Sequence, residues 1–441
     1  MLKSLYIHDR FYYYLSTIVG LFLLSYFIPN LFDITVLLLV LFGVLLLVDA
    51  GVLFRYKSGL VGKRLLPEKF SNSDENKVPI ELVNAYPFLI YVKLIDELPF
   101  QFQKRDFQWH AKIPVHTTYE YVYSVRPVER GEYHFGRLHL FASSPLRILS
   151  KRYSVDQQQT VAVYPSYIQM RKYEFLAFGN KLNAAGLKKI RRLGHTMEFE
   201  QIKNYIPGDD VRTINWKATA KTGSLMINQF QDEKSQPIYS IIDTSRAMKM
   251  PFEGLKLLDY AINSALAFSN IALIKGDKAG LVAFSKQVDT LVAATNKRIH
   301  INVLNEALYA ISTAFTDADF GLLYATVKRK ITHRSLLLLY TNFEHLSSLE
   351  RQIPYLKALA KQHLLVTIFF ENTQLTELTE SPATDLQQIY HKAVAEKFVY
   401  EKQLMVKELE RHGIHTILTQ PSQLSVNVIN TYLAFKAKGL V

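Results

Sequence analysis

The chain contains no cysteine among its 441 residues. This absence excludes disulfide bonds, thiolate metal sites and cysteine nucleophiles. The sequence also lacks the His-Glu-x-x-His pattern of zinc proteases, the Gly-x-Ser-x-Gly turn of serine hydrolases and the Gly-x-x-x-x-Gly-Lys loop that binds nucleotide phosphates. Because no recognisable catalytic constellation remains, we do not expect the chain to be an enzyme.

Acidic residues are too few to balance the basic ones. Lysine and arginine number 52, aspartate and glutamate number 39, and the formal net charge is +13. This surplus favours acidic partners, although basic cytoplasmic segments are also ordinary for a membrane protein. The basic segment 181–192 contains Lys188, Lys189, Arg191 and Arg192, but no aromatic residues are interleaved with them to stack on bases. We therefore expect contact with anionic lipid or an acidic protein face, and no nucleic-acid binding.

Residues 1–50 contain two uncharged apolar runs, 11–28 and 34–48, which Pro29 and Asn30 separate. A transmembrane helix needs about 20 residues, so each run reaches that length only with its flanks. One such run could be a signal peptide, but two in tandem without a small-residue cleavage site argue against that. We predict a two-helix transmembrane hairpin, and a buried helical hairpin of a soluble domain is the alternative.

Charges around these two runs predict an orientation. Only Asp33 lies between them, whereas basic residues flank both ends: Lys3, Arg10, Arg55, Lys57, Lys63 and Arg64. Basic segments stay in the cytoplasm during membrane insertion. We therefore expect both termini and the folded domains to be cytoplasmic, with the hairpin in the bilayer of the inner (cytoplasmic) membrane.

The region after the hairpin changes composition. Residues 51–76 are predicted to be a linker, and 77–170 contain six or seven short segments rich in aromatic and β-branched residues, with turn sequences between them. This spacing is typical of an all-β, immunoglobulin-like sandwich. Residues 171–237 follow as a bridging segment, in which we expect Trp216 to anchor the two folded domains to each other.

The bridging segment contains a turn at 207–210, where two aspartates stand side by side. Paired carboxylates can bind a metal or act as acid and base, so Asp209 and Asp210 are a candidate site. The alternative is that they cap the turn or a helix start and pair with Arg212 or Lys217. The turn composition favours this structural interpretation.

Residues 238–441 alternate apolar strands with helical segments, a pattern that predicts a doubly wound α/β domain. In such sheets, ligands bind at the carboxyl ends of the strands. Asp243 and Ser245 follow the first predicted strand, and Thr341 and Asn342 follow a later one. We therefore expect the functional edge of this domain at these residues.

These features resemble known families. Asp243-x-Ser245 and the run 276–284 are similar to the first and second strand entries of the von Willebrand factor type A (Rossmann-like) fold. The bridge resembles the bacterial family called "domain of unknown function 58", and with the sandwich and hairpin this resemblance covers almost the whole chain. The residues of the bridge that carry it are Tyr205, Pro207, Gly208, Asp209, Asp210, Arg212, Asn215, Trp216 and Lys217.

The biochemical activity of that family is not established. Its members are typically encoded beside MoxR-type AAA+ ATPases and other von Willebrand A proteins. The resemblance implies a membrane-anchored adaptor that docks such an ATPase during chaperone-like assembly or maturation of envelope proteins. The alternative function is a metal-dependent hydrolase that uses Asp209, Asp210 and Asp243.

The resemblance also implies a candidate metal site. In the metal-ion-dependent adhesion site of the von Willebrand A fold, hydroxyl and carboxylate oxygens from three loops bind one divalent ion, and Mg²⁺ suits such an oxygen shell. The corresponding residues here are Asp243, Ser245, Thr316 and Asn342.

Two positions depart from that pattern. Ala247 replaces the second serine of the first loop, and the neutral Asn342 stands where an aspartate is usual. Losing negative charge weakens the attraction for a hard dication, unless Asp317 or Asp319 compensates. We expect a docking surface whose Mg²⁺ is weak or absent, and in the metal-free case Asp243 would cap the following helix.

Overall fold

The computed structural model describes residues 4–28, 30–155, 158–178, 198–207, 209, 211–231, 236–383 and 385–441. The chain forms two compact units, Met1–Tyr164 and Pro165–Val441. Several predicted features lie outside the described residues, namely Gly208, Asp210, the side chain of Arg212 and the basic segment 181–192.

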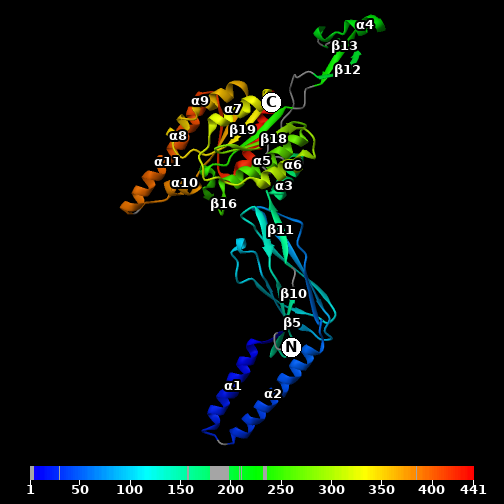
Figure 1. Cartoon of the computed structure of the whole chain (residues 1–441), viewed down its shortest axis with the longest axis vertical. Helices are drawn as coiled ribbons and strands as arrows, with labels where there is room; N and C mark the ends of the chain where they lie inside the picture. The colour runs from blue at the N-terminus through cyan, green and yellow to red at the C-terminus, as the bar shows by residue number, and fades with distance from the viewer. Residues whose placement is uncertain are drawn as a thin grey trace. The chain divides into compact units, whose positions relative to one another are not determined.

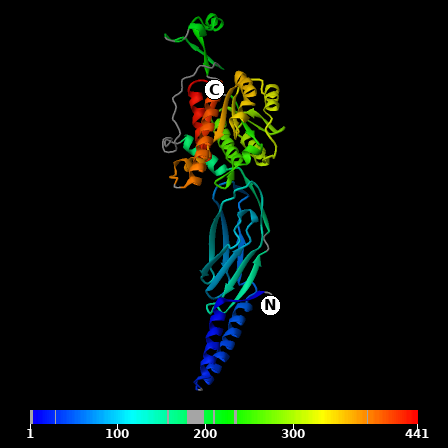
Figure 2. The same ribbon diagram turned by 90° about the vertical axis from the view of Figure 1, so that its left-hand side faces the viewer.

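The first unit contains two helices that lie side by side (Figure 1, Figure 2), α1 (Asp9–Ser25) and α2 (Leu31–Arg55). The rings of Phe22 and Phe32 meet near the turn between them, with centroids 6.0 Å apart. Much of their remaining surface is apolar and exposed, and Leu47 is 76% exposed. An open apolar surface of this kind indicates contact with lipid or with another protein.

Two helices among the described residues are long and apolar enough to cross a membrane, α2 and α5 (Leu257–Ile274). They differ in surroundings, because 89% of the apolar window of α5 is buried, against 11% for α2. Helix α5 is therefore a core helix of the second unit. Helix α1 has 17 residues and spans about 25 Å at 1.5 Å per residue, which is shorter than a hydrocarbon core of about 30 Å.

Residues 51–76, which we expected to form a linker, are ordered instead. Helix α2 continues to Arg55, and two strands follow, β2 (Leu60–Arg64) and β3 (Lys69–Ser71). In β2 every second residue is buried, including Arg64, so one side of this strand faces the core.

Apart from the parallel pair β11 and β3, the strands of the first unit pair antiparallel. Two sheets have the orders β1-β10-β9-β5-β6 and β2-β4-β7, and β11 pairs with β8 as well as with β3. Residues facing inward from these sheets share one hydrophobic cluster. The strands are β1 (Leu5–Ile7), β4 (Asn76–Asn84), β5 (Ile90–Asp96), β6 (Gln108–Ile113), β7 (Thr118–Val125), β8 (Gly131–Phe135), β9 (Leu138–Ser143), β10 (Leu149–Val155) and β11 (Gln159–Tyr164).

A buried ion pair lies inside this β-rich core. Nη1 of Arg64 is 2.5 Å from Oδ1 of Asp96, and the Tyr123 hydroxyl donates to Oδ2 of the same carboxylate at 2.7 Å. Burial raises the pKa of Asp96, while Arg64 opposes that rise. The arrangement satisfies a charge that the core would otherwise leave uncompensated.

The second unit is built on one six-stranded sheet in the order β18-β17-β14-β19-β20-β21. All neighbouring strands are parallel except β18, which pairs antiparallel with β17 at one edge. The strands are β14 (Pro237–Asp243), β17 (Lys278–Phe284), β18 (Val288–Thr295), β19 (Leu336–Tyr340), β20 (Leu364–Phe370) and β21 (His415–Thr419). A short hairpin, β15 (Pro251–Phe252) with β16 (Leu255–Lys256), precedes α5.

Helices cover both faces of this sheet (Figure 1). Ile238 and Ile242 face the cluster that contains α5, α6 and α12, whereas Tyr239 and Ile241 face the cluster that contains α7, α8, α9 and α11. The helices are α3 (Tyr167–Phe178), α6 (His300–Ala310), α7 (Phe320–Lys330), α8 (Leu346–Glu350), α9 (Ile353–Gln362), α10 (Thr373–Glu380), α11 (Leu386–Arg411) and α12 (Leu424–Ala437). This layering is that of a doubly wound α/β sheet.

The strand order creates a switch point between β14 and β19. From β14 the chain adds β17 and β18 on one side, and it then returns to add β19, β20 and β21 on the other. The carboxyl ends of β14 and β19 are therefore neighbours whose connections leave in opposite directions, and such points are where doubly wound sheets bind ligands.

The family-like bridge forms a small substructure in the described residues. Strands β12 (Glu198–Asn204) and β13 (Met226–Gln231) pair antiparallel, and the short helix α4 (Trp216–Thr222) lies between them in the chain. Asn215 caps α4 by accepting from the backbone N–H of Ala218 at 3.0 Å.

Candidate functional site

Asp243 is the last residue of β14, and it is 1% exposed. Its Oδ1 accepts the backbone N–H of Ser245 at 2.8 Å, and its Oδ2 accepts the hydroxyl of Thr341 at 2.7 Å. Burial raises the pKa of Asp243, and these hydrogen bonds oppose the rise. Among the described residues no cation forms an ion pair with this carboxylate.

Backbone hydrogen bonds hold the surrounding loops in place. The N–H of Thr244 donates to the carbonyl of Phe284 at 2.8 Å, and its carbonyl accepts from Ala314 at 2.8 Å. The N–H of Arg246 donates to the carbonyl of Thr316 at 3.0 Å. The loop after β14 is thus joined to the end of β17 and to the segment before α7, which makes the Asp243 edge a preformed structure.

A cavity of about 210 Å³ opens at this edge, and we call it the Asp243 cavity. Three of the four predicted metal-site residues line it, Asp243, Ser245 and Asn342, and so does Ala247, which replaces the second serine. Thr316 does not line it, and its neighbour Asp317 does. The other lining residues are Arg246, Ala318, Phe320, Phe343, Glu344, Ser348, Arg351 and Gln352.

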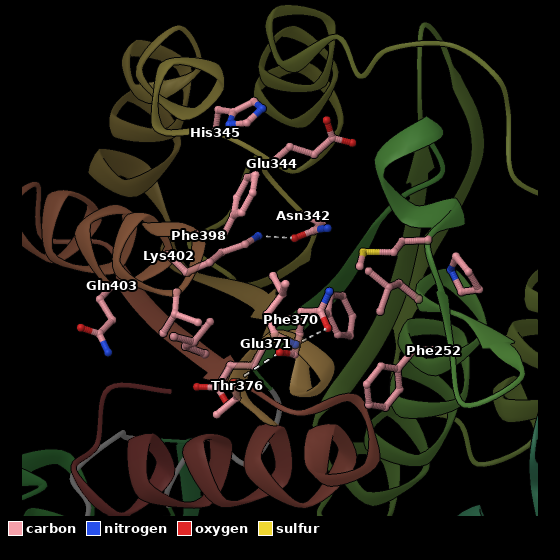
Figure 3. A pocket seen from close by; sticks show the side chains of 17 residues that line it. Phe252, Asn342, Glu344, His345, Phe370, Glu371, Thr376, Phe398, Lys402 and Gln403 are labelled. Carbon is pink, nitrogen blue, oxygen red and sulfur yellow. Dashed lines mark hydrogen bonds between the residues drawn. The ribbon is translucent and has the colours of Figure 1, made fainter. Parts of the chain in front are cut away.

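Asn342 is held by a lysine from a distant helix (Figure 3). Nζ of Lys402, on α11, donates to Oδ1 of Asn342 at 2.6 Å and to the carbonyl of Phe343 at 2.6 Å. Burial lowers the pKa of Lys402 to about 8, and the negative charge of Glu344 opposes that shift. The position that carries a carboxylate in a metal-type loop is here occupied by an amide bound to a cation.

A second, larger cavity of about 530 Å³ adjoins the first, and Asn342 and Glu344 line both. We call it the Lys402 pocket. Its walls come from the carboxyl ends of the strands, from α10 and α11 and from the β15 hairpin (Figure 3). Most of its lining is apolar, and the lining side chains include Phe252, Phe370, Leu375, Phe398 and Leu418, with the acidic Glu344 and Glu371 among them. A concave apolar site with a few polar groups is the usual form of a ligand or peptide pocket.

The oxygens at the Asp243 edge fit a divalent cation poorly. Both carboxylate oxygens of Asp243 already accept hydrogen bonds, and the side chain of Ala247 has no oxygen to bind a metal. Oδ1 of Asn342 accepts a hydrogen bond from the ammonium group of Lys402. The hydroxyl of Thr316 is buried without a partner among the described residues, yet it lies outside the Asp243 cavity. No cluster of three or more His, Cys, Asp or Glu side chains suited to a metal occurs in the described part of the chain.

The carboxylate of Asp209 makes contacts that stabilise its own turn. Oδ2 of Asp209 accepts the backbone N–H of Ile206 at 3.0 Å, and Oδ1 lies 3.3 Å from Nζ of Lys203. The Ile206 N–H lowers the pKa of Asp209, with Lys203 adding to the effect. Lys203, at the end of β12, reaches this carboxylate. Asp210 and the side chain of Arg212 lie outside the described residues, so the expected pairing of the two aspartates with Arg212 or Lys217 stays a prediction.

Other residues of the bridge form hydrogen bonds within it. Tyr205 donates its backbone N–H to the carbonyl of Leu225 at 2.8 Å, and Asn215 donates to Asn228 at 2.8 Å. Trp216, the first residue of α4, is 70% exposed. Its expected role as an anchor between the two folded domains stays a prediction.

Sequence reasoning missed Lys402. The lysine lies 60 residues after Asn342, on a helix whose other face packs on the sheet. No local pattern distinguishes it from the other lysines of α11, and only the pairing of β19 with β20 and the packing of α11 bring it to the strand ends. Thr341 was placed correctly at a strand end, but its bond to Asp243 required the strand order.

Sequence comparison places part of the chain beside a known family. The profile of the family described as "Protein of unknown function DUF58" matches residues 201–390, which include Asp209, Asp243 and Asn342. Uncharacterized protein YeaD of Bacillus subtilis (strain 168) is 24% identical over 251 residues, 54% of this chain and 59% of that protein. An uncharacterized protein of Mycobacterium tuberculosis (strain ATCC 25618 / H37Rv) is 22% identical over 166 residues, 37% of this chain and 51% of its own length. The chain thus spans between half and three-fifths of these curated relatives.

Solved structures with detectable similarity are more distant. The conserved hypothetical protein BatB from Bacteroides thetaiotaomicron has a TM-score of 0.30 and 14% identity, covering 46% of this chain and 99% of that one. An aerotolerance-related membrane protein from Bacteroides fragilis NCTC 9343 has a TM-score of 0.29 and 13% identity, covering 45% and 98%. At these TM-scores the likenesses carry no conclusion about this chain. What the comparisons establish is that the segment 201–390, with the Asp243 edge inside it, is similar to the domain of unknown function 58 family.

Proposed function

We propose that this protein is a membrane-tethered docking module with a von Willebrand A-like α/β domain, and that its partner binds at the Asp243 edge. The observation that carries the proposal is the pair of adjoining cavities at the sheet's switch point, one polar around Asp243 and one apolar around Lys402. Preformed concave sites at such edges are where this class of sheet engages ligands.

The tether is the pair α1 and α2. Supporting it are the exposed apolar surface of both helices and the length of α2. The basic residues on either side of the pair favour cytoplasmic termini and folded units at the inner membrane. Helix α1 would reach across the hydrocarbon core only with local thinning of the bilayer or with apolar flanking residues.

The partner we propose is a AAA+ ATPase of the MoxR type, with other von Willebrand A proteins as further members of the assembly. Residues 201–390 match the domain of unknown function 58 family, and the resemblance to that family is what implies such an ATPase as the partner. The role would be chaperone-like assembly or maturation of envelope proteins.

Docking at this edge would not depend on a metal. In a metal-type site a dication attracts a carboxylate of the partner, and here Lys402 already supplies a fixed positive charge beside Asn342. A partner side chain that enters the Lys402 pocket would meet this ammonium and the apolar wall together. Mg²⁺ would therefore contribute weakly or not at all.

The test is affinity purification of the whole chain from native membranes in a mild non-ionic detergent, followed by mass spectrometry. We compare the wild type with Asp243→Asn and Lys402→Met, and Asp289→Asn, an exposed residue of β18, serves as the matched control. We expect the AAA+ ATPase to be enriched with the wild type and the control, at least fivefold less with the two edge variants, and equally with EDTA or Mg²⁺. Absence of the ATPase from the wild-type sample, or equal recovery with all variants, contradicts the proposal.

The hydrolase alternative gains no support from the geometry. Asp209 does not line the Asp243 cavity, and its carboxylate is engaged by Ile206 and Lys203. Asp243 is buried with both oxygens occupied, and Asp210 lies outside the described residues. A pair of carboxylates must share one substrate to act together.

A further inference from the structure

The outer face of the first unit's five-stranded sheet carries a cavity that the proposed function does not use. Its volume is about 590 Å³, and it lies beside the start of α1. Strand pairing aligns Tyr91 with Lys112, and Lys93 with His110, so alternate residues of β5 and β6 present their side chains on one face. The opposite face carries Val92, which is buried in the core.

Positive charge is concentrated in this cavity. Lys93, Lys112 and Arg147 line it together with His8 and His110, and Asp9 is the one acidic residue among the described residues that line it. Such an imbalance within a concave surface attracts an anion, because the charges act on the same enclosed volume.

Two of these cations are positioned by one aromatic ring. The guanidinium carbon of Arg147 lies 3.1 Å from the centroid of Tyr91, and Nζ of Lys112 lies 5.4 Å from the same centroid. Both cations also line the same cavity as this ring. Nε of Arg147 is buried and has no hydrogen-bond partner in the described part of the chain.

The backbone that presents Arg147 is fixed to both apolar helices. Arg147 has a φ of 54°, an uncommon conformation for a residue other than glycine. The next two residues, Ile148 and Leu149, donate their N–H groups to Oδ2 of Asp49 in α2, at 3.2 and 2.9 Å. The carbonyl of Ile148 accepts the N–H of His8, which caps α1, at 3.1 Å. The surrounding structure thus holds the arginine at the point where the two helices meet the sheet.

We propose that this cavity binds a phosphate group, supplied by the headgroup of an anionic phospholipid. The inference rests on the proposed membrane tether, because α1 and α2 would bring the cavity to the headgroup layer. Lysine and arginine side chains at the membrane surface attract anionic lipids, and guanidinium groups bind phosphate with charge-assisted hydrogen bonds. Free inorganic phosphate has the same recognition chemistry and is the alternative source.

The test uses the whole chain in a non-ionic detergent and measures the binding of three soluble probes by thermal shift and native mass spectrometry. The probes are dihexanoyl phosphatidylglycerol, dihexanoyl phosphatidylcholine and inorganic phosphate. The site variant is Lys93→Gln with Lys112→Gln, and the matched control is Lys77→Gln with Lys104→Gln, two exposed lysines of the same unit that do not line the cavity.

We expect phosphatidylglycerol to bind the wild type and the control at least tenfold more tightly than phosphatidylcholine, and the site variant to lose at least tenfold in affinity. Tighter binding of inorganic phosphate than of phosphatidylglycerol, lost in the same variant, retains the phosphate site but assigns it to the free anion. Equal binding of both lipids, or equal binding by both double variants, overturns the proposal.

Alkaline carbonate extraction of native membranes separates this outcome from a failure of the tether. If the chain is released at high pH, the membrane proposal fails, and the inorganic phosphate measurement still decides whether the cavity binds the anion. Loss of the ATPase in the Asp243→Asn purification affects neither result, because Asp243 lies in the other unit.

Discussion

In the second unit, an aspartate is buried at the amino ends of the sheet strands (the amino edge) and another at the carboxyl ends (the carboxyl edge). The two carboxylates differ in their hydrogen-bond and ion-pair partners. At the amino edge, Asp277 precedes β17 and accepts from Lys436 and from the hydroxyl of Tyr432 on α12. At the carboxyl edge, Asp243 ends β14 and accepts from the backbone N–H of Ser245 and from the hydroxyl of Thr341. A buried charge with a cation beside it is compensated, whereas one without a cation is not, and uncompensated buried charges are frequent at functional sites.

One buried aspartate of the first unit follows the pattern of the amino edge. This residue, Asp96, is paired with Arg64 and hydrogen-bonded to Tyr123. Among these three buried aspartates, Asp243 is the one for which the described residues provide no ion pair. It is also the one that lines a cavity at the switch point of the sheet. The two properties coincide where the fold predicts a binding site.

The largest expected effect comes from removing the cation at the amino edge. Among the described residues, Lys436→Met leaves the buried Asp277 with Tyr432 and the N–H of Gln236 as partners, and we expect the second unit to lose about 3 kcal/mol of stability. The measurement is hydrogen exchange of α5 peptides in the whole chain over a urea series, which reports the second unit separately. Lys438→Met, an exposed neighbour, is the control and should change little. Equal losses of stability in the two variants would show that Lys436 does not compensate the charge of Asp277, and the contrast with Asp243 would fail.

Sequence patterns were sufficient to locate the carboxyl edge. Apolar strand segments that end in Asp243 and in Thr341 are local features, and alternation of strands and helices predicts their shared edge. The lysine and arginine partners of the buried aspartates could not be predicted from the sequence. Lys436 lies 159 residues from Asp277, and Arg64 lies 32 residues from Asp96, so their pairing depends on tertiary packing that no local period records. The linker expected at 51–76 was wrong for the same reason, because β2 and β3 are short strands whose pairing partners lie further along the chain.

An effect of intermediate size on the free energy of unfolding is expected from the protonation of Lys402. Burial lowers its pKa to about 8 from an unfolded value near 10.5, so the unfolded chain binds more protons between these two values. The contribution of Lys402 to stability is therefore present above pH 10.5 and is lost as the pH falls through about 8. We expect the stability of the wild type relative to Lys402→Met to rise with pH in this window, by at most about 1.4 kcal/mol per pH unit.

The measurement for Lys402 is the same urea series at pH 7.5, 8.5 and 9.5. Lys407→Met, an exposed position on the same helix, is the matched control, since it experiences the same general effects of alkaline pH. Stability curves of the wild type and of Lys402→Met that run parallel with pH would show that burial does not lower the pKa of Lys402. The carboxyl edge would then lack the buried lysine that distinguishes it from a metal-type loop.

The smallest expected effect on stability is also the sharpest test of the comparison. Asp243→Asn keeps an oxygen that can accept from Ser245 and removes a buried negative charge. Because burial raises the pKa of Asp243, its contribution to stability is present below its unfolded pKa and is lost as the pH rises through the folded value. At pH 7.5 the variant should therefore be as stable as the wild type, or more stable by up to about 1 kcal/mol. The difference should narrow as the pH is lowered towards 4, while binding at the edge is lost throughout. A large loss of stability at pH 7.5 would instead mean that the carboxylate at this edge is structural, as it is at the other.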